Sequence, residues 1–291
     1  MAEKRLPHTA RRVLAPFLQS LDAPGSGRYE TVSLAGLAEL AALLGISLRE
    51  AMIRCLEDGV WPLRFKANRG LFSAVEQAAL LRARVLVIGC GGLGGHVSQL
   101  LARTGVGGLA LCDPDVFEES NLNRQLFCTE DSLGKSKALA LQEGLRRLAS
   151  HMDIHIFPEA ANRENLPGML HGADVLADCL DNIRTRRELE QAARRAGIPF
   201  VHGSIAGSEG FALLQLPGHP SVPLERLYGP ADEAPEQGAE TRLGVPATTA
   251  AALAVLQCLL VVRALLNTTP PASGTPPFLH LDLSVPEIER L

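Results

Sequence analysis

The stretch VLVIGCGGLGGHVSQLLA, residues 85–102, is the feature that most limits what this chain can fold into. Four apolar residues precede a glycine cluster and a segment of helical periodicity, which predicts a buried strand, a tight turn and a helix. Gly89, Gly91 and Gly94 fit the pattern G-x-G-x-x-G. The first glycine permits the turn, the second lets a phosphate approach the backbone, and the third allows close packing of the helix. The stretch therefore predicts a nucleotide-binding turn.

From Arg84 onward, strand-like and helix-like segments alternate, which predicts an α/β fold with a Rossmann-like, largely parallel sheet flanked by helices. The segment PATTAAALAVLQCLLVVRALL predicts a buried helix, and TPPFLHLDLSVPEIERL predicts antiparallel strands that close the sheet. We expect one domain over residues 63–291. The stretch 217–242 predicts a long loop, of a kind that is usually functional or disordered. Strands are expected at RVLVI, GLALCD, DIHIF, DVLADCLD and IPFVHGS, and helices at GHVSQLLART, SKALALQEGLRRLA and RTRRELEQAARRAG.

Residues 1–62 are expected to form a small helical appendage. Ser33 and Ser47 are suited to cap two helices that end near Gly45 and Gly59. Two short helices joined in this way resemble a DNA-reading pair. The second helix, however, carries three acidic residues against two arginines, so its attraction to phosphate is weak. A packing or partner-docking role is favoured.

Composition narrows the function classes. The net charge of −4 gives no general attraction to nucleic acid or to an anionic membrane. The longest uncharged apolar run, 253–262, is far shorter than the roughly 20 residues that span a bilayer. The first residues, MAEKRLPHTARR, lack the apolar centre of a secretion signal, so we expect a cytoplasmic protein. The six cysteines are widely spaced, which suits reduced core residues better than a disulfide framework.

The residues after the glycine turn bear on which nucleotide it holds. Asp113 ends the next expected strand, where a carboxylate can bind ribose hydroxyls. A nicotinamide dehydrogenase and an ATP enzyme look alike up to this point. The following segment adds Asn121, Arg124 and Lys137. A dinucleotide needs little beyond the helix N-terminus for its pyrophosphate, whereas a triphosphate needs this added positive charge.

A carboxylate is also expected at the end of a later strand. In ADVLADCLDN, Asp181 and Asn182 fall at the carboxyl edge of the strand, where open α/β sheets bind ligands. Asp181 is well placed to hold Mg²⁺, which accompanies phosphates. Asp178 lies within the apolar run and could equally be structural. His151 and His155 in HMDIH invite a metal interpretation, but no third ligand is near in sequence, so surface histidines are favoured.

At this point the chain resembles the ThiF/MoeB/HesA family of ubiquitin-activating-type (E1-like) adenylyltransferases. The matching stretches are RVLVIGCGGLGG, GVGGLALCDPDVFEESNLNRQ, LGKSKA, DCLDN…R, IPFVHGSIAGSEG and LQCLLVVRALL, in family order. The resemblance implies ATP-dependent adenylation of the C-terminal glycine of a small ubiquitin-like sulfur carrier ending in Gly-Gly, with release of pyrophosphate. It also implies a homodimer.

On this template each matching residue has an expected role. Gly92 and Asp113 would hold the nucleotide. The phosphates would be held by Ser120, Asn121, Arg124 and Lys137. Asp181 and Asn182 would lie on the metal and adenosine side, and Arg124, Lys137 and Asp181 are the expected catalytic residues.

The chain also departs from the family pattern. Many relatives carry two C-x-x-C pairs that hold zinc, and this chain has none, so no zinc is expected. The acceptor cysteine of some relatives is also missing. The family motif R-Y-x-R-N reads RFKAN, which retains Arg64 for nucleotide binding but has Ala67 in place of the second arginine. In the family that arginine reaches the partner subunit's ATP, and Arg69 could substitute for it.

Two alternatives remain open from the sequence. An NAD-dependent oxidoreductase shares the glycine turn and Asp113 but gives no reason for Arg124, Lys137 and Asp181. A nucleotide-binding scaffold without catalysis is suggested by Ala67 and the missing cysteines. The resemblance is compatible with a carrier of molybdopterin synthesis and with one of thiamine synthesis.

Overall fold

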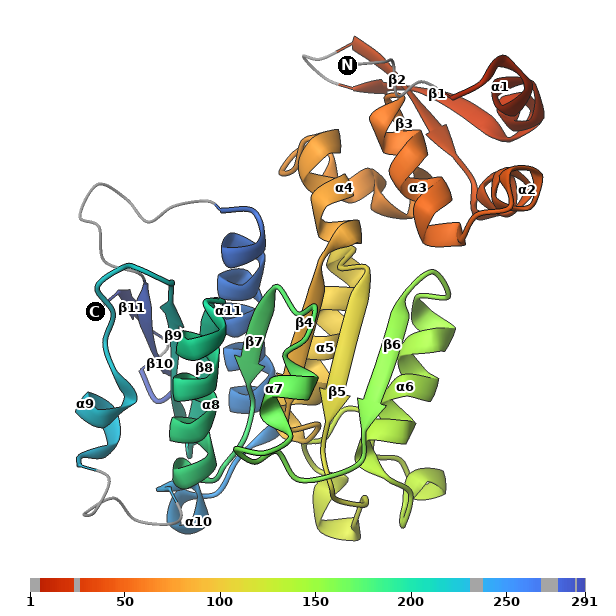
Figure 1. Ribbon diagram of the computed structural model, residues 1–291. Helices are drawn as coiled ribbons and strands as arrows, with labels where there is room; N and C mark the ends of the chain where they lie inside the picture. The colour runs from red at the N-terminus through yellow and green to blue at the C-terminus, as the bar shows by residue number, and fades with distance from the viewer. Residues whose placement is uncertain (1–5, 24–26, 231–237, 268–276, 286, 291) are drawn as a thin grey trace.

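The body of the protein is built on one large sheet (Figure 1). The computed structural model describes residues 6–23, 27–230, 238–267, 277–285 and 287–290. In this part of the chain the main sheet has eight strands in the order β11-β10-β9-β8-β7-β4-β5-β6. Strands β4 to β8 are mutually parallel, and β9, β10 and β11 continue the sheet in antiparallel fashion. The strands are β4 (Arg84–Ile88), β5 (Gly108–Cys112), β6 (Asp153–Phe157), β7 (Val175–Asp178), β8 (Phe200–Ala206), β9 (Glu209–Gln215), β10 (Phe278–Asp282) and β11 (Glu287–Arg290).

The predicted α/β fold and its closing antiparallel strands are therefore confirmed. Strand β9 was not predicted, although its sequence EGFALLQ is mostly apolar. It directly follows β8 and pairs with it over seven residues, from Phe200 opposite Gln215 to Ala206 opposite Glu209. The expected loop 217–242 contains two short helices, α9 (Leu224–Tyr228) and α10 (Glu240–Leu243), and its residues 231–237 lie outside the described part.

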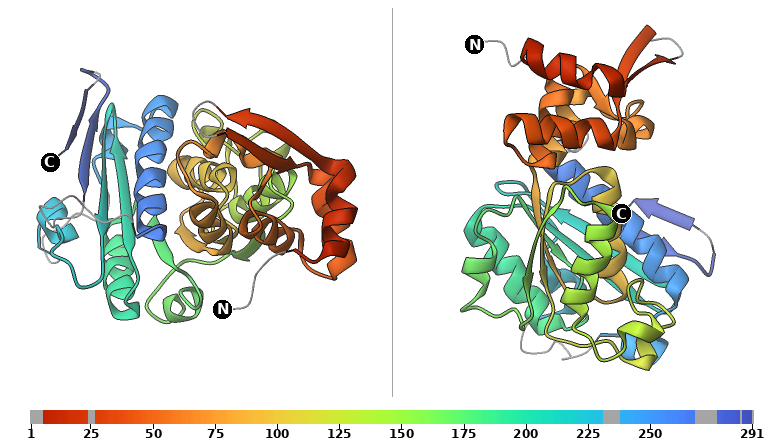
Figure 2. Two further views of the ribbon diagram at one scale, coloured as in Figure 1. Left: turned by 90° about the horizontal axis from the view of Figure 1, so that it is seen from above. Right: turned by 90° about the vertical axis from the view of Figure 1, so that its right-hand side faces the viewer.

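Helices cover both faces of the sheet (Figures 1 and 2). The alternation of side chains along β4 explains this, because Val85 and Val87 join one hydrophobic cluster whereas Leu86 and Ile88 join another. The first cluster includes residues of α5 (Gly92–Thr104), α6 (Lys137–Leu148) and α11 (Ala247–Leu265). The second includes residues of α7 (Leu166–Met169), α8 (Ile183–Ala196) and α9.

Helix α11 packs against α5, β8 and β9. By length and composition it is the one described helix apolar enough to cross a membrane, but 56% of its apolar window is buried inside the protein. It was predicted to be a buried helix, and its inner face is buried. Val255 and Leu259 on its outer face are 54% and 43% exposed. One face of the helix therefore packs in the core, and the opposite face is exposed.

The first residues form a separate, smaller layer whose sheet was not predicted. Helices α2 (Leu34–Leu44) and α3 (Leu48–Glu57) are confirmed, with Ser33 and Ser47 as their caps. The appendage is not purely helical, however. A second sheet in the order β1-β2-β3 packs with these helices. Its remaining elements are α1 (His8–Leu14), η1 (Ala15–Phe17), β1 (Leu18–Ala23), β2 (Gly27–Val32) and β3 (Val60–Pro62).

The core of this unit continues past residue 62. Phe65 of η2 (Leu63–Asn68) and Ala78 and Leu81 of α4 (Ala74–Arg82) belong to the same hydrophobic cluster. Arg49 ties the unit to the body by donating a hydrogen bond to the carbonyl of Gly107 (3.1 Å). The unit therefore sits at the amino-terminal end of β4 and β5 (Figure 1).

Candidate functional site

A cavity of about 550 Å³ opens at the opposite, carboxyl edge of the parallel strands. The chain runs from β4 to β5 and β6 on one side and then to β7 and β8 on the other, so the cavity lies where the strand order reverses. This is the position at which open α/β sheets bind ligands. Of the residues predicted for the site, the cavity is lined by Gly89, Gly91, Gly92, Asp113, Arg124, Lys137 and Asp181.

The glycine turn between β4 and α5 has no room for a Cβ at two of its glycines. Gly89 has a φ of +94°, and a Cβ there would lie 2.7 Å from the carbonyl oxygen of Cys179. A Cβ on Gly94 would lie 1.8 Å from the carbonyl oxygen of Gly89. Gly94 does not line the cavity but lets α5 pack on the turn, as predicted. Helix α5 thus begins at the cavity, where its unpaired N–H groups favour an anion.

Asp113 follows β5 and is 5% exposed. Its Oδ2 accepts a hydrogen bond from the backbone N–H of Cys90 (2.6 Å), and its Oδ1 accepts one from Asp115 (2.8 Å). Burial raises the pKa of its carboxyl. The carboxylate therefore holds the glycine turn, and each oxygen retains a further lone pair toward the cavity.

Arg124 is held by the short helix η3 (Glu119–Asn121). Its Nη1 donates to the carbonyl of Ser120 (2.9 Å) and to Oδ1 of Asn123 (3.0 Å). Asn121 is buried and its Oδ1 accepts from the N–H of Glu118 (3.1 Å). Ser120 and Asn121 do not line the cavity. They build the turn that carries Arg124 to it, so any direct contact between them and phosphate remains a prediction.

Lys137 is the first residue of α6, and its Nζ lies 2.9 Å from Oδ2 of Asp115. Both residues line the cavity. Asp115 was part of the quoted motif but was not selected from the sequence. The ion pair shows that the lysine is already partnered, so a phosphate would have to share it with the carboxylate.

Gln125 is a lining residue that the sequence reasoning missed. It is 7% exposed, and its side-chain Oε1 is buried without a hydrogen-bond partner. A buried acceptor without a partner is costly unless a ligand or a water supplies a donor. The one indication in the sequence was that Gln125 directly follows Arg124, a predicted site residue. The orphaned oxygen fits a ligand that carries hydroxyl or amino groups.

On the other side of the cavity, Asp181 follows β7 and is exposed. Asn182 does not line the cavity; it caps α8 by accepting from the N–H of Thr185 (3.0 Å). Arg186, also missed, lines the cavity from α8 although it is buried. The stretch GAETRLGV, in which Glu240 and Thr241 stand where some relatives have an acceptor cysteine, was given no site role from the sequence, yet it contributes four lining residues: Glu240, Thr241, Gly244 and Val245.

Among the described residues, the cavity wall carries Asp181 and three carboxyl groups that already have partners within the protein, those of Asp113, Asp115 and Glu240. No group of three or more His, Cys, Asp or Glu side chains in the described part of the chain could hold a metal ion. Mg²⁺ is typically held by one or two carboxylates together with the phosphates of a substrate. Asp181, at the cavity wall, fits that mode. All six cysteines are buried and free, which agrees with reduced core residues.

Arg64 lies at the far end of the body. Its Nη2 donates to the carbonyl of Leu148 (3.0 Å), and its Nη1 lies 3.2 Å from Nδ1 of His151. Lys137 begins the helix that ends at Leu148, so Arg64 is about 17 Å from the cavity along α6. Arg64 therefore does not reach the cavity of its own chain, and its predicted role in nucleotide binding depends on a contact with a partner subunit. A contact across a dimer remains a prediction, as it does for Arg69, whose guanidinium stacks on Tyr29.

The prediction of two surface histidines is half right. His155 has a side chain that is 56% exposed, but His151 is only 5% exposed. It packs edge-on against Phe65 beside the smaller layer, an arrangement that a local pattern does not reveal. Burial, followed by the charge of Arg64, lowers the pKa of His151 to about 3.

Comparison with known proteins shows the family and the fold. A model of the ThiF family matches residues 65–290. The chain is 41% identical over 160 residues to the adenylyltransferase and sulfurtransferase MOCS3 of Mus musculus, covering 55% of this chain and 34% of that protein. It is 39% identical over 162 residues to the SAMP-activating enzyme E1 of Haloferax volcanii (56% and 58%). It is 37% identical over 144 residues to the sulfur carrier protein ThiS adenylyltransferase of Bacillus subtilis (49% and 43%).

The chain thus spans between a third and three fifths of the length of these curated relatives. Among solved structures, Escherichia coli MccB in complex with ATP superimposes with a TM-score of 0.64 at 19% identity and covers 96% of this chain and 95% of that one. MccB with AMPCPP and MccA gives the same TM-score at 22% identity, covering 78% and 70%. These two likenesses establish the fold.

Proposed function

We propose, because the chain belongs to the ThiF family, that it is an adenylyltransferase: it uses ATP to adenylate the C-terminal glycine of a small ubiquitin-like sulfur carrier. The observation that carries the proposal is the cavity itself. It brings the glycine turn together with Asp113, Arg124, Lys137 and Asp181, which come from four separate segments. The curated relatives are named for the same kind of reaction, on ThiS in one case and on SAMP in another.

The reaction needs no nucleophile from the protein. A carboxylate oxygen of the carrier attacks the α-phosphorus, the bond from that phosphorus to the bridging oxygen breaks, and pyrophosphate leaves. Catalysis then consists of alignment and of neutralising charge on the phosphates. Arg124 and Lys137 supply that charge from one wall. Asp181 would hold Mg²⁺ against the phosphate oxygens, and the ion would supply further positive charge.

The two alternatives explain less of the cavity. An NAD-linked oxidoreductase would use the glycine turn and Asp113, but two cations and an exposed carboxylate would have no role. A scaffold without catalysis would bind ATP and turn nothing over. Measuring the affinities for ATP with Mg²⁺ and for NAD distinguishes the oxidoreductase from the adenylyltransferase. Measuring turnover distinguishes the scaffold from the adenylyltransferase.

The test is exchange of labelled pyrophosphate into ATP, measured with and without a carrier that ends in Gly-Gly. We expect exchange only with the carrier. Arg124→Ala should lower the rate by about 10² to 10³, the usual loss for one preorganised charge-stabilising donor. Arg146→Ala, an exposed arginine in the last turn of α6, is the matched control and should leave it unchanged. Exchange without any carrier, or an Arg124→Ala variant equal to the control, would show that the chemistry is wrong.

We further propose a homodimer in the cytoplasm, without nucleic-acid or membrane partners and without zinc. The homodimer follows from the family resemblance. Mixing Arg64→Ala/Arg69→Ala subunits with Asp181→Ala subunits should restore activity if either arginine acts across the dimer. A fully active monomer would exclude such a contribution.

A further inference from the structure

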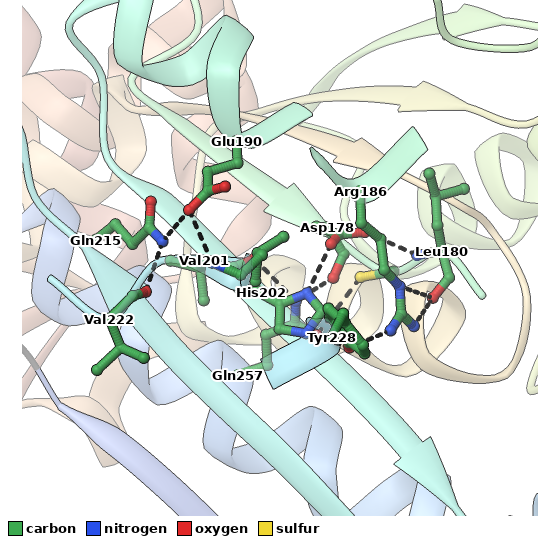
Figure 3. Close-up of polar contacts among 12 residues, drawn as sticks. Asp178, Leu180, Arg186, Glu190, Val201, His202, Gln215, Val222, Tyr228 and Gln257 are labelled. Atoms are coloured by element: carbon green, nitrogen blue, oxygen red, sulfur yellow. Dashed lines mark hydrogen bonds and ion pairs between the residues drawn. The ribbon is translucent and has the colours of Figure 1, made fainter. Parts of the chain in front are cut away.

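Next to the cavity, three buried polar side chains and the half-buried Tyr228 form a continuous chain of hydrogen bonds that the reaction described above does not use (Figure 3). Nδ1 of His202 lies 2.7 Å from Oδ2 of Asp178, and its Nε2 lies 2.9 Å from the hydroxyl of Tyr228. Nη1 of Arg186 donates to the same hydroxyl (2.5 Å). Asp178 and His202 are completely buried, and Arg186 is 4% exposed.

The carboxylate of Asp178 can only accept, so Nδ1 of His202 donates to it. Burial lowers the pKa of His202, which agrees with a neutral ring whose Nε2 carries no proton. Nε2 then accepts from the hydroxyl of Tyr228, and that hydroxyl accepts from Arg186, which can only donate. The charge of Arg186 is balanced by the carboxylate of Asp178, so the network carries no net charge.

The network ends on the backbone that leads into the cavity. Nε of Arg186 donates to the carbonyl of Leu180 (3.2 Å), and Nη2 donates to the same oxygen. The N–H of Leu180 donates to Oδ1 of Asp178 (3.1 Å). Both backbone polar groups of Leu180 are thus fixed by the two charged members of the network. The next residue is Asp181, whose carboxylate lines the cavity.

We propose that Tyr228 is a positioning residue for the cavity. With His202, it holds Arg186 against Leu180, and it thereby fixes the turn that presents the carboxylate of Asp181. This inference rests on the proposed function, because it assigns Asp181 a role in binding the nucleotide and its metal. It also means that the loop after β9, which carries Tyr228 on α9, helps to build the opposite wall of the cavity.

The hydroxyl of Tyr228 is separable from the packing of α9. That helix is also held by Leu224, which is fully buried and whose N–H donates to Glu190 (3.1 Å), and by a hydrogen bond from Arg187 to the carbonyl of Gly229. A phenylalanine at 228 would keep the ring and this packing. It would leave one N–H of Arg186 and the Nε2 of His202 without partners, which loosens the hold on Leu180.

The chain offers a matched control, since it has two tyrosines and the other, Tyr29, lies in β2 of the smaller layer. In pyrophosphate exchange, Tyr228→Phe should lower kcat about 10-fold, the loss of one hydrogen bond to a charged group. It should also raise the Mg²⁺ concentration needed for half-maximal rate, while the KM for the carrier stays constant. Tyr29→Phe should change none of these. A Tyr228→Phe variant equal to Tyr29→Phe, or one that loses rate with an unchanged Mg²⁺ dependence, would overturn the proposal.

A second measurement does not depend on turnover. Protein labelled with 3-fluorotyrosine should give two ¹⁹F signals, assigned with the Tyr29→Phe variant. Asp181→Asn should shift the Tyr228 signal and leave that of Tyr29 in place, because only Tyr228 is connected to the turn. An unshifted Tyr228 signal would overturn the coupling. Absence of exchange in the unsubstituted protein, with this shift still present, would instead contradict the proposed function alone.

Discussion

Gly94 is the position where the structure makes the sharpest quantitative prediction about the nucleotide turn. A Cβ added to Gly94 would stand 1.8 Å from the carbonyl oxygen of Gly89, whereas real Cβ atoms essentially never approach within 3.0 Å. The helix and the turn must therefore separate by about 1.2 Å or more to admit an alanine. The obstacle is backbone, so no side-chain rotation relieves it.

This displacement should affect binding more than folding. Overpacking of this kind costs about 1 to 3 kcal/mol of unfolding free energy. A misplacement of about 1 Å in a binding site costs on the order of 10² in the function that depends on it. We therefore expect Gly94→Ala to remain folded but to bind ATP with Mg²⁺ about 100-fold more weakly.

Gly95, the next residue of α5, supplies the control. A Cβ there would meet Phe127 at 3.6 Å and Leu126 at 3.8 Å, which are ordinary contacts. Gly95→Ala should stabilise the helix by up to about 1 kcal/mol and leave ATP affinity unchanged. Calorimetric titration gives the affinity and urea unfolding the stability. If Gly94→Ala bound ATP as tightly as Gly95→Ala, the close contact would not determine the shape of the turn.

Three further predictions concern pH, thiols and magnesium. Because the pKa of His151 is about 3 in the folded protein, the unfolded chain binds the extra proton below pH 6.5, and this histidine alone should lower the free energy of unfolding by about 2 kcal/mol between pH 7 and pH 5. Burial also lowers the pKa of His202, which adds to the loss in the same direction. His151→Asn should therefore reduce the loss by about 2 kcal/mol and His155→Asn should leave it unchanged, as urea unfolding at the two pH values can check. Cys→Ser variants that fold should all complete transfer, and purified protein should contain no stoichiometric zinc; one variant that binds ATP without completing transfer would reveal a covalent intermediate. Removing Mg²⁺ with a chelator should weaken ATP binding, and equal affinity with and without the ion would contradict the role given to Asp181.

The body was predictable from sequence because its signals are local. Strands β4 and β5 are apolar runs, β6 alternates polar and apolar residues, and the glycine turn has steric requirements that only glycine satisfies. Strand β9 and the sheet of the smaller layer depend on pairing with other segments. The strand β3, for example, is only three residues long, and nothing in VWP marks it as a partner of β2.

The site was predictable to the same degree. Asp113 and Asp181 follow strands, Lys137 begins a helix and Arg124 lies in the motif between them, and the fold brings all four to one cavity. The network around Tyr228 could not be inferred, because Tyr228 is 26 residues from His202 and 42 from Arg186 in the chain. The available signals were weaker ones: a carboxylate inside the apolar run of β7 and a histidine inside that of β8.

The charge of the cavity gives a physical reason for a metal ion to accompany the triphosphate. The described residues of its wall include three cations and four carboxyl groups, which sum to one net negative charge when all are ionised. The cations are also partly engaged, Lys137 by Asp115 and Arg186 by the network next to the cavity. A bare triphosphate would therefore meet a wall that repels it overall, whereas a triphosphate whose charge is reduced by Mg²⁺ would not. On this argument the arginine and lysine alone do not make the site receptive, and the carboxylate of Asp181 is favourable only when it shares a cation with the phosphates. The charged residues that line the cavity are Asp113, Asp115, Arg124, Lys137, Asp181, Arg186 and Glu240.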